Sequence, residues 1–296
     1  MNGLIYFNGM LKHEHEVTLW TLDRSYLYGE GLFETLKASQ GFIPFLPEHL
    51  QRLFHGMEVL RMRFEISASK IEFALYQTLH HNRLKDAYLR LMVSRENREI
   101  GSMEIGEGSN VVVLARPFEK PPLRLYTEGM SAQLVEDFKI FPDPLCQVKS
   151  TNYLRPLLAH RMARESGYDE ALLLNTFGNL AEGATGNLFI FDGKKILTPP
   201  LSEGPLPGVT RQVVLELMKK NYLDYEEGPI KMADLLAAEE AFFTNSIKEI
   251  APLTSVNDKP IGTGKVGAQT QRLMELFQEE LQYRLESFES KRWGVK

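Results

Sequence analysis

Short segments of alternating apolar and polar residues, separated by turn signals, make up the first third of the chain. Residues 4–7 read as a strand. They precede Asn8-Gly9, a dipeptide typical of two-residue hairpin turns, and the returning arm extends through Thr18. A helix is predicted from Pro47, because apolar residues recur after it at helical spacing. Further strands are expected at residues 31–38, 42–45, 86–94 and 110–115.

A proline-rich segment then interrupts the pattern. Pro117, Pro121 and Pro122 each lack a backbone donor and have a fixed φ angle, so this segment can continue neither a helix nor a strand ladder. We therefore expect an N-terminal α+β domain over residues 1–116, an interdomain linker over 117–122, and a C-terminal α+β domain over 123–296.

The remaining chain mixes strands and helices without a regular strand-helix alternation. This order favours two α+β domains over a doubly wound parallel sheet. A helix is expected to end at Gly167, which can adopt a left-handed cap. The predicted strands are 123–126, 131–136, 171–174, 187–191 and 196–197, and the predicted helices are 152–166, 210–220 and 268–285.

Composition narrows the function classes. The chain is 43% hydrophobic and 25% charged, with a net charge of −5, and no apolar stretch approaches the roughly 20 residues that span a bilayer. We expect a soluble protein with no leader segment, no membrane partner and no nucleic-acid surface, since such a surface would be basic. The lone Cys146 rules out an intramolecular disulfide and favours a reducing, cytoplasmic location.

Two motifs are set aside. No His-Glu-x-x-His pattern accompanies the seven histidines, so we expect no metal site. Residues 262–267 satisfy Gly-x-Gly-x-x-Gly, the dinucleotide-binding fingerprint. They follow Asn257-Asp258-Lys259-Pro260 close to the predicted C-terminal helix, however, whereas the fingerprint follows a buried parallel strand. We therefore do not expect a dinucleotide.

Lys149 is the strongest candidate for chemistry. Alone, it is either a solvated lysine or a nucleophile, which would need desolvation or a cationic neighbour. Three ordered blocks favour the nucleophile: Val-Lys-Ser-Thr-Asn-Tyr-Leu at 148–154, Leu-Ala-Glu-Gly-Ala-Thr-Gly-Asn-Leu-Phe at 180–189, and Leu-Pro-Gly-Val-Thr-Arg at 206–211. Together they closely resemble the signatures of the class IV pyridoxal-phosphate enzymes, which include branched-chain aminotransferases, D-amino-acid aminotransferases and aminodeoxychorismate lyases. The resemblance runs from about Ile5 to Phe277.

The resemblance implies a fold, a cofactor and two central residues. The fold would be the two-domain fold type IV, similar to D-amino-acid aminotransferase, in a homodimer whose active site borders the partner subunit. Pyridoxal 5'-phosphate would lie between the lobes as a Schiff base on Lys149, in the C-terminal domain, and Lys149 would also move the proton of the substrate Cα. Glu182 would face the pyridine nitrogen, where a carboxylate favours the protonated, electron-withdrawing ring.

The phosphate site has its own rationale. Gly208-Val209-Thr210 opens a predicted helix, and the free amides and dipole of a helix N-terminus attract anions. Arg52 stands where the family places the phosphate's cation. Helical periodicity instead puts Arg52 opposite the apolar face of its helix, where an arginine is normally solvated. A second phosphate-contacting turn would be formed by Thr244 and Asn245.

Substrate contacts are expected in the N-terminal domain. A period of two places Tyr88 and Arg90 on one strand face, where a phenol and a cation could bind a carboxylate. A solvated strand face is the alternative. The Tyr-x-Arg spacing here is similar to the pattern of the branched-chain aminotransferases. The resemblance adds Tyr28 and Phe33 as residues that line the substrate pocket, and Thr35 as a threonine that lyases use near the cofactor.

The subfamily remains open between two activities. Thr35 and the segment 244–250 resemble lyases, but residues 94–99 replace the glycine-rich stretch that often follows this strand in lyases. The interdomain substrate loop of the aminotransferases is not recognisable either. Our first hypothesis is a 4-amino-4-deoxychorismate lyase, which releases 4-aminobenzoate and pyruvate. The second is a branched-chain or related aminotransferase that uses 2-oxoglutarate. A non-catalytic pyridoxal-phosphate-binding protein or an interaction protein is disfavoured, since Lys149 and Glu182 are both present.

Overall fold

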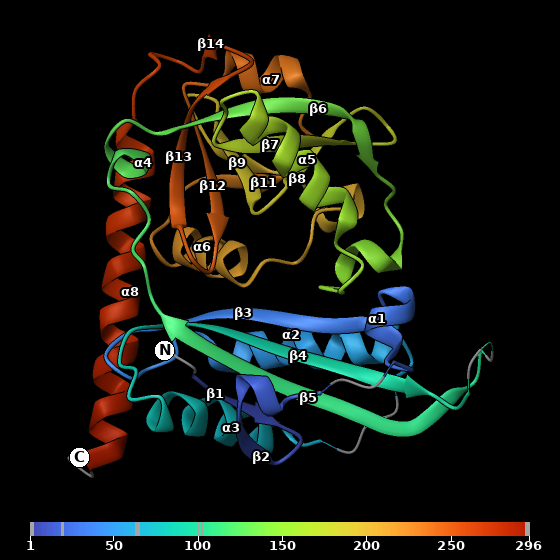
Figure 1. Ribbon diagram of the computed structural model, residues 1–296. Helices are drawn as coiled ribbons and strands as arrows, with labels where there is room; N and C mark the ends of the chain where they lie inside the picture. Colours follow the sequence, from blue (N-terminus) through green and yellow to red (C-terminus); the bar gives the residue numbers. More distant parts are fainter. Residues whose placement is uncertain (1–2, 19–20, 63–65, 100, 102, 294–296) are drawn as a thin grey trace. The chain divides into compact units, whose positions relative to one another are not determined.

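The chain folds into two compact units, each a mixture of helices and strands (Figure 1). The computed structural model describes residues 3–18, 21–62, 66–99, 101 and 103–293. One unit comprises the chain up to Lys120 together with Val148–Tyr153, and the other comprises Pro121–Gln147 and the chain from Leu154 onward. The segment with Lys149 thus groups with the first unit, although its place in the sequence suggested the second. The expected α+β class is confirmed.

An antiparallel sheet organises the first unit. Its strand order is β2-β1-β5-β4-β3, and the long β4–β5 pair lies at its centre. The Asn8-Gly9 turn joins β1 to β2 as expected. The strands are β1 (Leu4–Phe7), β2 (Met10–His13), β3 (Gly31–Ala38), β4 (Ala87–Asn97) and β5 (Ile105–Pro117).

Helices cover one face of this sheet. Alternation along β4 sends Leu89, Leu91 and Val93 into the helix-covered core and leaves Tyr88 and Arg90 on the open face. Helix α2 packs against β3, and α3 packs against β1 and β5; α2 lies behind β3 and β4 in Figure 1. The helices of this unit are η1 (Glu14–Glu16), α1 (Arg24–Tyr28), α2 (Leu46–Val59) and α3 (Ala68–His81).

A mixed nine-stranded sheet organises the second unit, in the order β11-β10-β9-β12-β13-β6-β7-β8 with β14 beside β13. Strand β8 pairs with both β7 and β9, the latter through Glu182 and Asn187, so six of these strands close into a ring. The strands are β6 (Met130–Ile140), β7 (Glu170–Asn175), β8 (Leu180–Gly183), β9 (Asn187–Phe191), β10 (Ile196–Thr198), β11 (Tyr225–Glu227), β12 (Glu240–Asn245), β13 (Glu249–Val256) and β14 (Lys259–Pro260).

Helices flank this second sheet. Helix α5 packs on β6 and β7, while α6 and α8 contact each other and strands β12 and β13. Within the described residues, no helix is both long and apolar enough to cross a membrane. The helices are α4 (Arg124–Thr127), η2 (Pro144–Gln147), α5 (Leu154–Glu165), η3 (Leu201–Glu203), α6 (Val209–Lys220), α7 (Met232–Ala237) and α8 (Ala268–Trp293).

Several local predictions differ from the structure. The returning arm of the first hairpin, expected through Thr18, ends at His13 before η1. Residues 123–126, expected as a strand, form most of α4, because so short a segment has no period that distinguishes a strand from a helix. Residues 42–45 do not form the expected strand: Phe42 makes only an isolated bridge with Ser39, and Phe45 has φ 55° just before α2 begins. Helix α3 was not predicted. Its N-cap is Ser67, whose side chain accepts a hydrogen bond from the Lys70 amide.

The core of the first unit makes a direct stability prediction. Leu89 is fully buried on β4, so Leu89→Ala removes apolar contacts and leaves a cavity. We expect the free energy of unfolding to fall by about 2–5 kcal/mol in urea denaturation. Phe73→Ala is the matched control in the same unit, because Phe73 is 63% exposed, and it should change stability by less than about 0.5 kcal/mol. Equal losses in both variants would contradict this assignment of the core.

Candidate active site

The backbone around Lys149 is fixed by strand β3. The Phe33 amide donates to the Lys149 carbonyl at 3.0 Å, and the Thr151 amide donates to the Gly31 carbonyl at 2.8 Å. A bridge between Leu32 and Ser150 completes the pairing. Lys149 therefore belongs to an ordered segment that lies along β3, although the sequence suggested only an element boundary.

Two aromatic rings surround the Lys149 amine. Its Nζ lies 4.7 Å from the centroid of the Phe33 ring and 5.6 Å from that of Tyr153. The two rings meet edge to face at 5.3 Å. Such rings orient a cation over their faces. Sequence reasoning did not single out Tyr153, and its only signal was its place in the 148–154 block.

Cross-strand register gathers three predicted residues on the open face of the first sheet. Thr35 pairs with Arg90, and Phe33 pairs with Met92 two residues further along the same face. The guanidinium carbon of Arg90 lies 3.7 Å from the Phe33 ring centroid, and Nη1 donates to Thr35 Oγ1 at 2.8 Å. Phe33 thus contacts both Lys149 and Arg90, so the structure brings four predicted residues into one group: Phe33, Thr35, Arg90 and Lys149.

The other two predicted substrate residues lie elsewhere in the first unit. Tyr88 pairs with Lys37 and lies two residues from Arg90 on the same partly exposed face of β4. Tyr28 is 46% exposed on α1, where its hydroxyl accepts a hydrogen bond from Asn97 Nδ2 at 3.3 Å. Both remain predictions as substrate contacts.

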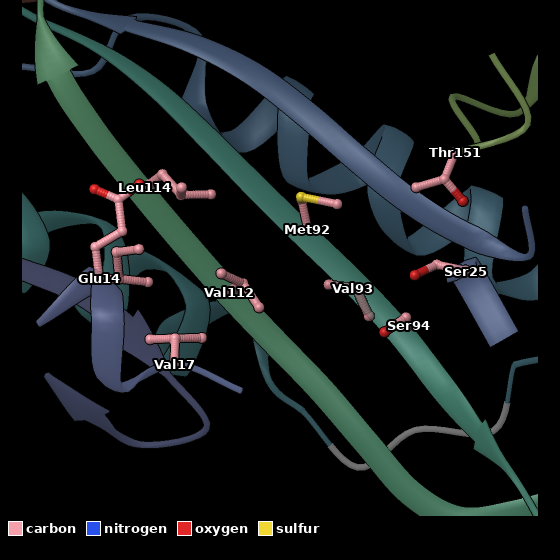
Figure 2. Close-up of a pocket in the computed structure, with 10 residues that line it drawn as sticks. Glu14, Val17, Ser25, Met92, Val93, Ser94, Val112, Leu114 and Thr151 are labelled. Carbon is pink, nitrogen blue, oxygen red and sulfur yellow. The ribbon is translucent and has the colours of Figure 1, made fainter. Parts of the chain in front are cut away.

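A cavity of about 310 Å³ opens on the same sheet face. Its floor includes Met92, Val112 and Leu114, whose side chains project from β4 and β5 in Figure 2. Met92 pairs with Phe33, and Leu114 pairs with Arg90, so apolar surface directly adjoins the guanidinium. Ser25 and Thr151 supply hydroxyls at another part of the rim.

A buried ion-pair cluster lies on the opposite face of β3. Glu34 accepts hydrogen bonds from Arg52 Nε at 2.8 Å, from Arg52 Nη2 at 2.6 Å and from His49 Nδ1 at 2.7 Å. Burial raises the pKa of Glu34, but the charge of Arg52 and the hydrogen bond from His49 outweigh burial and lower it to about 2. Glu34 is therefore ionised at neutral pH and can only accept, so His49 carries its proton on Nδ1.

Arg52 is not solvated, and the periodicity prediction for it was wrong. Its side chain is only 8% exposed. The bidentate partner, Glu34, comes from a neighbouring strand that the helical period of α2 does not include. Burial lowers the pKa of His49, so this neighbour stays neutral beside the ion pair. The role of Arg52 as the phosphate's cation stays a prediction.

In the second unit, Glu182 is held beside the loop that leads into α6. Its carboxylate accepts from Asn187 Nδ2 at 3.2 Å and from the Leu206 amide at 3.1 Å. Asn187 Nδ2 also donates to the Leu206 carbonyl at 2.8 Å. Asn187 is buried and joins the end of β8 to this loop, a role that sequence reasoning missed.

The N-terminus of α6 offers amides to an anion. Gly208 is the N-cap and makes no side-chain cap hydrogen bond. The amides of the first turn have no intrahelical acceptor, and the helix dipole adds positive potential there. A Cβ at Gly208 would lie 2.0 Å from Asn187 Oδ1, so only glycine fits this approach. Val209 and Thr210 follow in the first turn and are buried.

The end of β12 holds a buried polar atom that has no partner among the described residues. The Thr244 side chain is 1% exposed, and within the described residues its Oγ1 makes no hydrogen bond. Beside it, Asn245 Nδ2 donates to the Thr185 carbonyl at 3.1 Å. Asn245 Oδ1 accepts from the amides of Ile247 and Lys248, which shapes the turn. Because an unmade buried hydrogen bond is unfavourable, Thr244 is suited to bind a ligand oxygen.

The Glu34 cluster predicts how stability depends on pH. Because the folded-state pKa of Glu34 is depressed from 4.5 to about 2, its contribution is complete above pH 4.5 and is lost as pH falls towards 2. At 1.36 kcal/mol per tenfold, this corresponds to about 3 kcal/mol. Denaturation of wild type and Glu34→Gln should therefore give a stability difference that shrinks by this amount between pH 6 and pH 2. A difference that stays constant over this range would refute the assignment.

Comparison with known proteins gives the family. The family model described as amino-transferase class IV matches residues 31–256. The chain is 32% identical to a putative branched-chain-amino-acid aminotransferase of Methanocaldococcus jannaschii, over 99% of this chain and 98% of that protein. It is 30% identical to the aminodeoxychorismate lyase of Bacillus subtilis, over 98% of this chain and 99% of that protein.

Solved structures agree with these sequence matches. The branched-chain aminotransferase of the archaeon Thermoproteus uzoniensis, solved with norvaline, superposes with a TM-score of 0.84 at 27% identity and 93% coverage of both chains. A branched-chain amino acid aminotransferase complexed with N-(5'-phosphopyridoxyl)-L-glutamate superposes with a TM-score of 0.86 at 27% identity and 94% coverage of both chains. The expected fold type IV architecture is therefore confirmed. The chain belongs to the class IV aminotransferase family, whose members are pyridoxal-phosphate-dependent enzymes.

Proposed function

We propose that the chain is an amino-acid transaminase that moves the amino group of a branched-chain or related α-amino acid to 2-oxoglutarate. The observation that carries this proposal is the fixed guanidinium of Arg90, stacked on Phe33 and bonded to Thr35. A carboxylate would bind this cation, and the apolar surface around Met92 adjoins it. An amino acid with an apolar side chain presents these two features together.

The residues of the second unit fit the cofactor's chemistry. The uncapped N-terminus of α6 and the unpartnered hydroxyl of Thr244 suit a phosphate group, and Glu182 suits a protonated pyridine nitrogen. When bound, pyridoxal phosphate supplies an electron-withdrawing ring that stabilises negative charge at the substrate Cα. We propose that the phosphate is held by Gly208, Val209, Thr210, Thr244 and Asn245, with Arg52 as its cation.

We propose that Lys149 would hold the cofactor through a covalent bond to its amine and, once the substrate's amino group has displaced it from that bond, would take the proton from the substrate Cα with the freed amine. The rings of Phe33 and Tyr153 restrict where its Nζ can lie. The backbone pairing with β3 restrains the residue itself. A base held in this way needs little reorganisation when it moves a proton.

Arg90 is proposed to bind a substrate carboxylate. A guanidinium has five N–H donors and stays charged in proteins, so the bond to Thr35 leaves donors for a bidentate contact. Tyr88 is on the next rung of the same face and is proposed as a further donor. Because 2-oxoglutarate has two carboxylates, the same arginine could serve both substrates in turn.

The second candidate is the 4-amino-4-deoxychorismate lyase, favoured by Thr35. Its hydroxyl lies on the same face as Phe33 and Arg90, where a proton carrier for the aromatising ring would be useful. Against this role, Thr35 Oγ1 already accepts from a permanent cation, which opposes uptake of a proton. Thr35 is better suited to anchor Arg90, and we therefore place transamination first.

We also propose that the enzyme works in the cytoplasm as a homodimer. Cys146 is the single cysteine of the chain, as suits a reducing compartment, and burial raises the pKa of its thiol, which makes it a poor nucleophile. Tyr28 is exposed on α1, as suits a residue that completes the site of a partner subunit.

Thr244 gives a test of the phosphate site. Thr244→Val replaces an unpartnered buried hydroxyl with a methyl group of similar volume, so stability without the cofactor should hold or rise slightly. Affinity for pyridoxal phosphate should fall roughly tenfold, the value of one hydrogen bond to a charged group. Equilibrium dialysis of the cofactor-free protein and a thermal melt measure the two effects. Unchanged affinity would remove Thr244 from the site.

The activity itself is tested by spectroscopy and product analysis. With cofactor bound, L-leucine should shift the visible absorption band to that of the pyridoxamine form, and 2-oxoglutarate should restore it with release of L-glutamate. Lys149→Ala should abolish turnover and alter the band. Arg90→Ala should lower kcat/KM by roughly a hundredfold, as expected for a charged bidentate contact.

Arg98→Ala is the matched control, because Arg98 is an exposed arginine of the same unit, and its kcat/KM should be unchanged. Release of 4-aminobenzoate from 4-amino-4-deoxychorismate, without exchange of amino groups, would replace transamination by the lyase reaction. Inactivity towards both substrate classes would reject both proposals.

A further inference from the structure

A fully buried carboxylate in the second unit has no part in the proposed chemistry. Glu170 begins β7 and is 1% exposed. Its carboxylate accepts hydrogen bonds from the Thr185 hydroxyl and from Lys248 Nζ, the latter at 3.3 Å. His160 Nδ1 lies 3.2 Å from its other oxygen. Removing one partner of such a buried charge destabilises the folded state, because the remaining charge is left uncompensated.

Two partners of Glu170, Thr185 and Lys248, lie on the turns that follow the strands with the proposed cofactor contacts Glu182 and Thr244. Thr185 lies in the turn between β8, which contains Glu182, and β9, which begins at Asn187. Lys248 lies in the turn that follows Thr244 at the end of β12. One carboxylate thus reaches both turns from a third strand.

Two further contacts link the same turns. Lys248 Nζ lies 3.3 Å from Thr185 Oγ1, so the lysine, the threonine and Glu170 contact one another pairwise. Asn245 Nδ2 donates to the Thr185 carbonyl at 3.1 Å. Without Glu170, the ammonium and the hydroxyl would keep each other but would lose their common attachment to β7.

The charge of Glu170 is stable at neutral pH. Burial raises its pKa, but the hydrogen bond from His160, the charge of Lys248 and the hydrogen bond from Thr185 together outweigh burial and lower it. The carboxylate therefore stays an acceptor for both turns. Charge-assisted hydrogen bonds are stronger than neutral ones, so the contact restrains both turns.

We propose that Glu170 is a positioning residue for the cofactor: through Thr185 and Lys248 it holds the turn after Glu182 against the turn after Thr244. The proposal rests on the proposed function, since it takes Glu182 as the contact for the pyridine nitrogen and Thr244 as a contact for the phosphate. Glu170 itself touches neither group. Its loss removes the charged attachment of both turns to β7 and leaves only the contacts of Lys248 and Asn245 with Thr185 between them, so the two turns should be held less firmly and Glu182 and Thr244 should meet the cofactor less often.

Glu170→Gln is the first variant, because glutamine keeps the shape and one acceptor but removes the charge. It leaves the Lys248 ammonium partly buried without its anion, so the melting temperature should fall. The double variant Glu170→Gln/Lys248→Met removes that uncompensated charge, and its melting temperature should recover. Both variants lack the charged contact of Glu170 with the two turns. Comparing them therefore separates an effect on stability from an effect on the position of the turns.

The measurement is pyridoxal phosphate affinity of the cofactor-free protein, with the pH midpoint of the visible band of the loaded protein as a second readout. We expect the dissociation constant to rise roughly tenfold or more in both variants, as for loss of a charged hydrogen bond. The pH midpoint should shift in both. His160→Gln is the matched control: it removes the third partner of Glu170 on α5, which lies on neither turn, and should leave affinity within roughly twofold.

Affinity that recovers with the melting temperature in the double variant would overturn the proposal, because Glu170 would then act only on stability. An unchanged dissociation constant in Glu170→Gln, or an equal loss in His160→Gln, would also overturn it. None of these readouts uses an amino substrate. Failure of the transaminase proposal, seen with L-leucine, is therefore distinguishable from failure of the Glu170 proposal.

Discussion

The register between β3 and β4 is the constraint on which the candidate site residues of the first unit depend. It places Thr35 opposite Arg90 and Phe33 opposite Met92. Because side chains alternate between the faces of a sheet, a slip by one residue would send this whole set into the helix-covered core. The same slip would move Glu34 away from α2. Strand pairing therefore decides the positions of both Arg90, the cation proposed to bind the substrate, and Glu34, the anion that holds Arg52.

Two buried carboxylates play parallel structural parts. Glu34 joins β3 to α2 through Arg52 and His49, and Glu170 joins β7 to two turns through Thr185 and Lys248. In each case burial alone would favour the neutral acid, but cationic and hydrogen-bonding partners keep the charge. Such pairs add directional restraint that apolar packing does not give. Glu34 restrains Arg52, the proposed cation for the phosphate, and Glu170 restrains the turns that follow Glu182 and Thr244.

The arrangement around Arg90 also explains why the subfamily is hard to assign. Thr35 resembles the lyases, whereas the pair Tyr88 and Arg90 resembles the branched-chain aminotransferases. In the structure these are not separate signals, because the threonine accepts a hydrogen bond from the arginine. One hydrogen bond therefore joins a lyase-like residue to an aminotransferase-like residue. Its effect is to hold the Arg90 guanidinium in place.

The sequence by itself determined the family, the α+β class and the cofactor, because ordered motif blocks identify a family even where periodicity is ambiguous. It also singled out Lys149 and Glu182, whose roles stay predictions. It also predicted the faces of β4, since alternation of period two needs no partner to be read. It failed at residues 123–126, where four residues cannot show a period, and at Arg52, whose partner is on another element. Tertiary structure alone decided that residues 148–153 pair with β3, that Asn187 and Glu170 are attached to the cofactor turns, and that Thr35 bonds Arg90. These contacts join residues far apart in the chain, and local patterns carry no information about such pairs.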